Sequence, residues 1–379
     1  MIRKTRIMTP GPTPVPVEVL LEGAKETIAH RTPKFKKMLK NASENLKKVF
    51  RTDGHVFILS SSGTGALETA VANTVRPDDK VITVVGGKFG ERWAELCQAY
   101  GANMVKIEVE WGDLARPEQI EKALKENPDT KVVFTTLSET STGVVYDIKG
   151  MAEVVKKSDA ILVVDAVSGL IAEPLEMDEW GVDIAVAGSQ KAFMMPPGLA
   201  FVAVNGEKAW KRIEETTSPR YYFDLRAYKK KYPDTPYTGA VNLVYQLNKA
   251  LEMIEDEGME NIWKRHALFA ESMRNGIKKI GLELLPKKPG NVLTAVKIPE
   301  GVDASEFLKI ARDEYGMYFS GGQGKLSGKI FRVSNLGYVD RVDMISAMAV
   351  IEMTLKKMGK DVPVGAGIKA VEETLLRGE

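Results

Sequence analysis

The sequence is poor in the residues that make disulfides and metal sites. It has one cysteine, Cys97, so no disulfide can form within the chain, which favours a reducing compartment. It has three histidines, His30, His55 and His266, whose spacing with Cys97 matches no common set of zinc ligands. We therefore expect a protein without a bound metal.

Long hydrophobic segments and an excess of one charge are also lacking. No window approaches the ~18 apolar residues of a membrane span. The N-terminal MIRKTRIMTPGPTPVP lacks the apolar core of a signal peptide. The net charge of +2 favours neither nucleic acid nor an anionic membrane as a partner. These features predict a cytoplasmic protein that binds neither nucleic acid nor membranes.

Apolar, β-rich runs alternate with helical patterns over the first two thirds of the chain. Seven such runs occur, namely HVFILS (55–60), KVITVV (80–85), NMVKIEV (103–109), KVVFTTL (131–137), AILVVDAV (160–167), DIAVAGS (183–189) and LAFVAVN (199–205). The alternation predicts an α/β fold with a seven-stranded, mainly parallel sheet and helices on both faces. Because few residues separate the last two runs, too few for a parallel crossover, we expect these strands to be antiparallel.

The pattern changes near residue 250, where long charged helices lead into short strands and a Gly-rich turn. This change predicts a smaller C-terminal α+β domain over residues 256–379, after a large domain over residues 16–255. The preceding arm, residues 1–15, contains several prolines, which favour an extended chain rather than a helix.

Polar residues follow three of the predicted strands where each strand ends. The first run leads into Ser62, Gly63 and Thr64, and the glycines and the helix that follows suit a bound anion. Asp165 ends the run AILVVD, and Lys191 follows DIAVAGSQ. Since the carboxyl ends of parallel strands meet at one edge of a sheet, we expect these residues to lie together.

An anion cradle, a carboxylate and a lysine are the three groups that pyridoxal 5′-phosphate requires. They would serve its phosphate, its ring nitrogen and its aldehyde. Each also has an ordinary structural explanation: a capped turn, a buried ion pair or N-cap, and a paired lysine. Their order and spacing together favour the cofactor.

Eight motifs make the sequence resemble the class V aminotransferases of pyridoxal phosphate fold type I, most closely the alanine–glyoxylate / serine–pyruvate group. They are TPGPTPVP, SSGTGALE, GGKFGERW, SETSTGV, VVDAVSGL, GSQKAFMMPPG, TPYTGAVNLVYQL and KIFRVSNLG. The resemblance runs nearly end to end. It implies a homodimeric transaminase that moves the amino group of alanine or serine to glyoxylate or pyruvate by a ping-pong mechanism.

The resemblance also assigns roles to individual residues. It implies that Lys191 is catalytic and binds the cofactor, and that Arg332 and Gly11 bind the substrate carboxylate. The implied cofactor ligands are Ser62, Gly63, Thr64, Phe89, Thr140, Asp165, Gln190, Lys191, Thr235 and Thr238. Of these, Thr235 and Thr238 are expected to reach the neighbouring subunit's phosphate. Two positions depart from the family: Phe89 replaces a frequent Trp, and Thr235 replaces a Tyr found in some relatives.

Other readings remain open at this level. A cysteine desulfurase is disfavoured because Gln190 precedes the lysine and no cysteine follows Cys97. An aspartate, phosphoserine or aminoethylphosphonate transaminase would use the same scaffold, and a non-catalytic α/β binding protein would bind no chromophore. His30 and Arg31 are candidates for the site entrance or for a plain surface turn.

Overall fold

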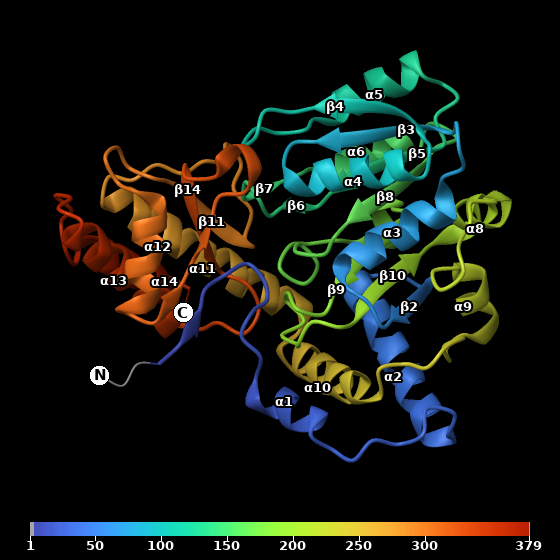
Figure 1. Ribbon diagram of the computed structural model, residues 1–379, viewed down its shortest axis with the longest axis horizontal. Coiled ribbons are helices and arrows are strands. Elements are labelled where there is room, and N and C mark those ends of the chain that lie inside the picture. Colours follow the sequence, from blue (N-terminus) through green and yellow to red (C-terminus); the bar gives the residue numbers. More distant parts are fainter. Residues whose placement is uncertain (1–3, 379) are drawn as a thin grey trace.

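The computed structural model describes residues 4–378, and its largest element is a seven-stranded sheet (Figure 1). Its strands are β2 (His55–Leu59), β3 (Lys80–Val85), β4 (Asn103–Glu108), β5 (Val132–Thr136), β8 (Ile161–Asp165), β9 (Ile184–Gly188) and β10 (Ala200–Val204). They lie in the order β2-β10-β9-β8-β5-β3-β4. Each of the seven predicted runs therefore supplies one strand.

The direction of β10 is the exception within this sheet. It pairs antiparallel with both β9 and β2, as predicted for β9, whereas the other pairs are parallel. Two antiparallel pairings in succession make β2 run in the same direction as β9 and β8. The carboxyl ends of these three strands consequently lie at one edge of the sheet.

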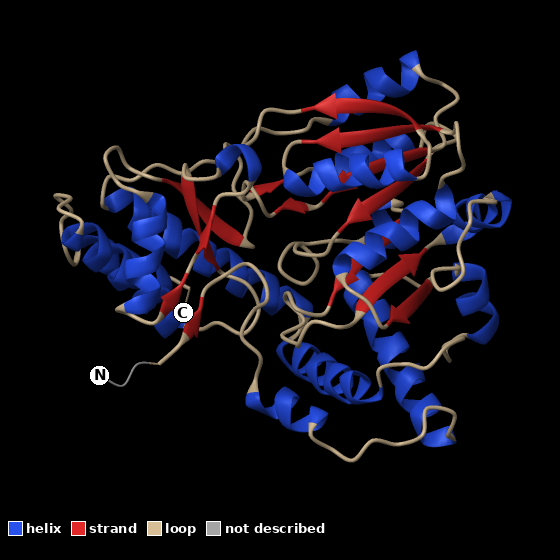
Figure 2. Cartoon of the chain, in the orientation of Figure 1, coloured by secondary structure: helices blue, strands red, loops and turns tan. Residues whose placement is uncertain are grey.

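Helices cover both faces of the sheet (Figure 2). One face packs against α2 (Pro33–Phe50), α5 (Pro117–Glu126), α6 (Ile148–Val155) and α10 (Val241–Glu257). The other face packs against α3 (Gly63–Thr74), α4 (Lys88–Ala99), α8 (Gly206–Glu215) and α9 (Leu225–Lys231). Successive residues alternate between the faces, as Val163 and Val164 of β8 do. Both sides are buried, which explains the nearly continuous apolar runs.

The C-terminal part has its own sheet and core. Strands β11 (Leu293–Lys297), β14 (Ile330–Ser334) and β13 (Ser320–Gly321) pair in this order. Helices α11 (Met259–Lys279), α12 (Ala304–Asp313), α13 (Arg341–Lys357) and α14 (Ala366–Leu376) bury their apolar faces there. Helices α10 and α11 meet at Gly258. The expected fold class is confirmed, and the exact domain boundaries stay a prediction.

The N-terminal arm crosses between the two parts. Strand β1 (Arg6–Ile7) pairs with β12 (Met317–Tyr318) of the C-terminal part. The chain then reaches α1 (Val17–Gly23), which packs on α10. The short elements that complete the described chain are β6 (Ser138–Glu139), β7 (Val144–Val145), α7 (Met177–Trp180) and the 3-10 helix η1 (Gly324–Leu326).

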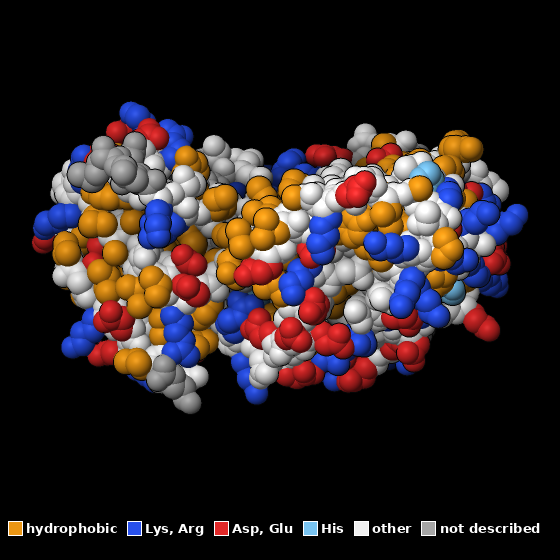
Figure 3. Space-filling model, turned by 90° about the horizontal axis from the view of Figure 1, so that it is seen from below, with side chains coloured by type: hydrophobic (Ala, Val, Ile, Leu, Met, Phe, Trp, Pro, Cys, Tyr) orange, Lys and Arg blue, Asp and Glu red, His pale blue; other side chains and the backbone are white. Residues whose placement is uncertain are grey.

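The surface carries charges of both signs. Seen from below, Lys and Arg side chains are interspersed with Asp and Glu, and hydrophobic side chains lie among them (Figure 3). No helix among residues 4–378 combines the length and the apolar character that a membrane crossing requires.

Candidate active site

Three of the predicted residues lie at the sheet edge where β2, β8 and β9 end. Asp165 is the last residue of β8, and Lys191 follows the end of β9. Ser62 precedes α3 and caps it, because its Oγ accepts a hydrogen bond of 3.2 Å from the Gly65 N–H. The structure therefore brings the predicted anion loop (residues 62–64), the Asp165 carboxyl and the Lys191 amine to one edge of the sheet, as expected.

The amine of Lys191 lies in a tight, poorly hydrated space beside the N-terminal arm. Its Nζ donates to the Pro10 carbonyl at 2.5 Å. A Cβ at Gly11 would lie 2.2 Å from Nζ, so residue 11 has to be glycine if the amine is to stay there. Burial lowers the pKa of Lys191 to about 8; nearby Arg332 and Arg92 add to the lowering and Asp165 opposes it.

The carboxyl of Asp165 is also buried. Its Oδ1 accepts a hydrogen bond of 2.8 Å from the Val167 N–H. Burial raises its pKa to about 7, and the charge of Glu139 adds to this effect, whereas Arg92 and Lys191 oppose it. A buried carboxylate gains stability from a cationic neighbour, and the protonated ring nitrogen of pyridoxal phosphate is a cation of suitable size.

Gln190 lies beside the loop that begins α3. A Cβ at Gly188 would lie 3.0 Å from Gln190 Oε1 and 3.5 Å from Gly63 Cα. Gln190 Oε1 is buried and has no hydrogen-bond partner among the described residues. Such an atom is costly to bury, and rotation of the amide would present N–H groups at the same point. Those groups and the start of α3 suit a phosphate.

Arg332 enters the site from β14 of the C-terminal part. Its Nε and Nη2 donate to the Gly321 carbonyl at 3.0 and 2.8 Å, and its Nη1 donates to the Thr140 carbonyl at 2.8 Å. Burial lowers its pKa to about 10, opposed by Glu139, so it is a cation at neutral pH. Thr140 in turn donates from Oγ1 to Ser168 Oγ at 2.7 Å.

Phe89 lies in the first turn of α4. The guanidinium carbon of Arg92 lies 4.9 Å from the centre of its ring, and Arg92 Nη1 donates to Thr64 Oγ1 at 3.2 Å. The backbone N–H of Phe89 is bound by the carboxylate of Glu139. Sequence reasoning missed Arg92 and Glu139, although both stand in the quoted motifs GGKFGERW and SETSTGV.

Thr235 and Thr238 lie next to Arg31 and His30, respectively. Thr235 is buried; its Oγ1 donates to the Tyr237 carbonyl at 2.7 Å, and its own carbonyl accepts from Arg31 Nη1 at 2.7 Å. Thr238 Oγ1 lies 3.5 Å from His30 Nε2. The roles of these four residues stay predictions.

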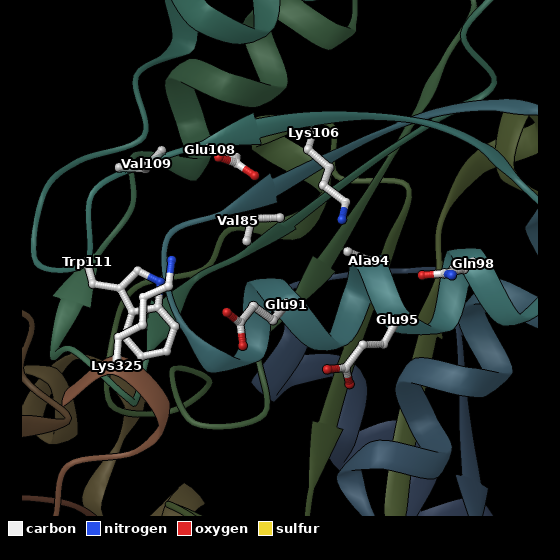
Figure 4. Close-up of a pocket in the computed structure, with 10 residues that line it drawn as sticks. All are labelled: Val85, Glu91, Ala94, Glu95, Gln98, Lys106, Glu108, Val109, Trp111 and Lys325. Carbon is white, nitrogen blue, oxygen red and sulfur yellow. The ribbon is translucent and has the colours of Figure 1, made fainter. Parts of the chain in front are cut away.

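A cleft of about 370 Å³ lies elsewhere, between α4 and the edge strand β4 (Figure 4). Glu91 and Glu95 of α4 face it together with Lys106 and Glu108 of β4. At one end Lys325 Nζ lies 5.6 Å from the centre of the Trp111 ring. None of the predicted site residues lines it. Within residues 4–378 no cluster of His, Cys, Asp and Glu could hold a metal.

The family model for class V aminotransferases matches residues 10–344. The chain belongs to this family. The Paracoccus denitrificans L-aspartate–glyoxylate aminotransferase is 38% identical over 98% of this chain and 96% of its own. The Methylorubrum extorquens serine–glyoxylate aminotransferase is 36% identical over 98% of this chain and 96% of its own. The solved pyridoxamine–pyruvate aminotransferase of Mesorhizobium loti, 27% identical, superposes with a TM-score of 0.95 over 100% of this chain and 98% of its own.

Family membership and the shared fold confirm the resemblance seen in the sequence. The protein is a pyridoxal phosphate-dependent aminotransferase of fold type I that transfers an amino group from an amino acid to a 2-oxo acid. A non-catalytic binding protein is thereby rejected.

Proposed function

We propose that this aminotransferase uses Lys191 as its catalytic residue and takes its amino group from alanine or serine and gives it to glyoxylate or pyruvate. The observation that carries the proposal is the position of Lys191 and Asp165 at one sheet edge, where Asp165 is buried and the Lys191 Nζ lies against the Pro10 carbonyl. Two of the relatives described above are named for glyoxylate as a substrate.

The residues present fit the cofactor. Ser62, Gly63, Thr64 and Gln190 would hold its phosphate, and Asp165 its ring nitrogen. Phe89 would cover one face of the ring, with Thr140 beside the ring. Lys191 would be the point of covalent attachment. When bound, pyridoxal phosphate acts as an electron sink that weakens the bond between the substrate Cα and its hydrogen.

The chain's own groups then move the proton. The Lys191 amine, with a pKa of about 8, can take a proton from Cα near neutral pH and would deliver it to the cofactor carbon bonded to the substrate nitrogen. The Pro10 carbonyl keeps this amine beside the site, and the absence of a side chain at Gly11 leaves space for it. Gly11 would also offer its backbone to the substrate carboxylate.

The guanidinium of Arg332 would bind the substrate carboxylate, since its planar fork matches two carboxylate oxygens. Replacing Arg332 with lysine should raise the KM for both substrates about 10- to 100-fold, because hydrogen bonds between charged groups are lost. Pyridoxal phosphate affinity should change little. Steady-state kinetics with alanine and glyoxylate measure the effect. The control is Arg226→Lys, an exposed arginine paired with Asp224; an equal KM in R332K and wild type contradicts the role.

We further propose a cytoplasmic homodimer in which Thr235 and Thr238 complete the neighbour's phosphate site. These threonines do not contact the anion loop residues Ser62–Thr64 of their own chain through any hydrogen bond in the described structure. Helix α1 exposes three apolar side chains, Val17, Leu20 and Leu21, that a second subunit could cover.

Half-reactions test the substrate assignment. The enzyme loaded with pyridoxal phosphate is mixed with single amino acids, and the change of the cofactor's absorbance is followed without an acceptor. Alanine or serine should convert the cofactor fastest, and glyoxylate or pyruvate should restore it in a separate step, as ping-pong kinetics require. Fastest conversion by aspartate, phosphoserine or aminoethylphosphonate would replace the proposed donor.

A further inference from the structure

Glu139 is a fully buried carboxylate for which the proposed mechanism has no role. It lies at the end of the two-residue strand β6 and is 0% exposed. Its oxygens accept hydrogen bonds from the N–H groups of Phe89 at 3.2 and 3.3 Å and Gly90 at 3.0 Å. They also accept from Ser141, from its N–H at 3.2 Å and its Oγ at 2.5 Å.

These bonds secure the beginning of α4. Ser141 Oγ accepts from the Lys88 N–H at 2.9 Å, so residues 139–141 satisfy the first three N–H groups of the helix. These groups have no partner within a helix and are usually capped by its own preceding side chain. Here that residue is Gly87, and a Cβ on it would lie 2.3 Å from Glu139 Cδ. The carboxylate of Glu139, which is far away in the sequence, occupies the space where a capping side chain at residue 87 would lie.

The partners of Glu139 favour its ionised form. Each is a hydrogen-bond donor, and a helix N-terminus stabilises a negative charge. Burial raises the pKa of Glu139, and the hydrogen bonds from Ser141, Gly90 and Phe89 reduce this rise without cancelling it. A glutamine here would turn an N–H group toward one of these donors, which would leave a buried N–H without a partner.

Glu139 also connects three parts of the site. It holds the turn that carries Phe89, and its neighbour Thr140 gives its carbonyl to Arg332. A negative charge on Glu139 stabilises the Arg332 cation and raises the pKa of Asp165. A single substitution at residue 139 should therefore affect Phe89, which would cover the cofactor ring. It should also affect Arg332, which would bind the substrate carboxylate, and Asp165, which would contact the ring nitrogen.

We propose that Glu139 is a positioning residue for the cofactor site: it fixes Phe89 over the ring and supplies a buried negative charge beside Asp165 and Arg332. The proposal depends on the proposed function, because Phe89 and Asp165 contact the cofactor ring only if the protein binds pyridoxal phosphate.

The test compares Glu139→Gln with Glu352→Gln. Glu352 on α13 is also 0% exposed and binds the N–H groups of Gly365, Gly367 and Ile368 at the start of α14. Both variants lose a buried helix cap, so both should unfold at a lower temperature. Only E139Q should bind pyridoxal phosphate at least about tenfold more weakly, as titration of the cofactor-free protein by absorbance would show.

The pH dependence of the affinity for pyridoxal phosphate distinguishes a role of Glu139 in positioning the cofactor site from a role only in stabilising the fold. Cofactor affinity should fall at low pH as Asp165 becomes protonated, near its pKa of about 7. Loss of the Glu139 charge removes a repulsion from Asp165, whereas Arg92 and Lys191 still face it, so the fall should move to lower pH in E139Q only.

Glu139→Asp keeps the charge on a shorter side chain and covers the case in which E139Q fails to fold. It should weaken cofactor binding, but the pH at which the affinity for pyridoxal phosphate falls should stay near that of wild type. Unchanged affinity in E139Q, or in E139D if E139Q does not fold, overturns the proposal. A fall at the same pH in E139Q and wild type also overturns it. If wild-type protein itself binds no pyridoxal phosphate, the proposed function is wrong as well.

Discussion

Replacing Lys191 with alanine should reduce transamination by about 10,000-fold and abolish the visible absorbance of the attached cofactor. A positioned acid–base group contributes up to about 10⁴-fold, and the same amine would also be the covalent anchor. The mutation removes a half-buried amine that donates to one backbone carbonyl and whose pKa is already lowered to about 8, so the fold should tolerate it. Turnover of alanine with glyoxylate and the absorbance spectrum measure the two effects.

Lys325→Ala is a matched control, because this exposed lysine contacts Trp111 rather than the site. Borohydride reduction followed by peptide mass spectrometry identifies the lysine that carries the cofactor. The label should lie on the peptide containing Lys191 in wild type and in K325A. A label on another lysine, or a visible spectrum retained in K191A, would show that the assignment is wrong.

The main sheet could be predicted because its signals are local. Buried strands such as 161–165 are short apolar runs. The short link 189–199 allows only an antiparallel turn between β9 and β10. The strand order could not be predicted, because pairing β10 with β2 joins residues far apart in the chain. Two-residue strands such as β6 and β1 are too short to show any periodicity.

The site shows the same division between local and distant information. Asp165 and Lys191 were found because parallel strands bring their carboxyl ends to one edge. The contacts of Lys191 with Pro10 and of Arg332 with Gly321 could not be found from the sequence. Both use a backbone carbonyl, which every residue possesses. Glu139 could not be singled out from the sequence, because its partners in α4 lie about fifty residues earlier. Arg332 would pass for a surface charge by sequence alone, yet it is 5% exposed.

Replacing Asp165 with asparagine should lower kcat about 100- to 1,000-fold, the usual effect of removing one buried group that stabilises charge in the transition state. The amide has nearly the same shape and can keep the bond from the Val167 N–H, but it has no negative charge to hold a ring nitrogen protonated. Steady-state kinetics at saturating cofactor measure the loss. The control is Asp183→Asn, which changes a half-buried aspartate that is also bonded to a backbone N–H, that of Leu162.

Without cofactor, the same Asp165 substitution should stabilise the fold at high pH. Burial raises the pKa of Asp165 from 3.8 to about 7, so between these values the folded protein holds a proton that the unfolded chain has released. The free energy of unfolding therefore falls as pH rises through this window and stays lower above it. Cofactor-free D165N should thus melt above wild type near pH 8, and the difference should shrink near pH 4.5. A cofactor-free D165N that melts below wild type near pH 8 would show that the protein itself already stabilises this carboxylate, leaving no physical need for a cationic ligand beside it.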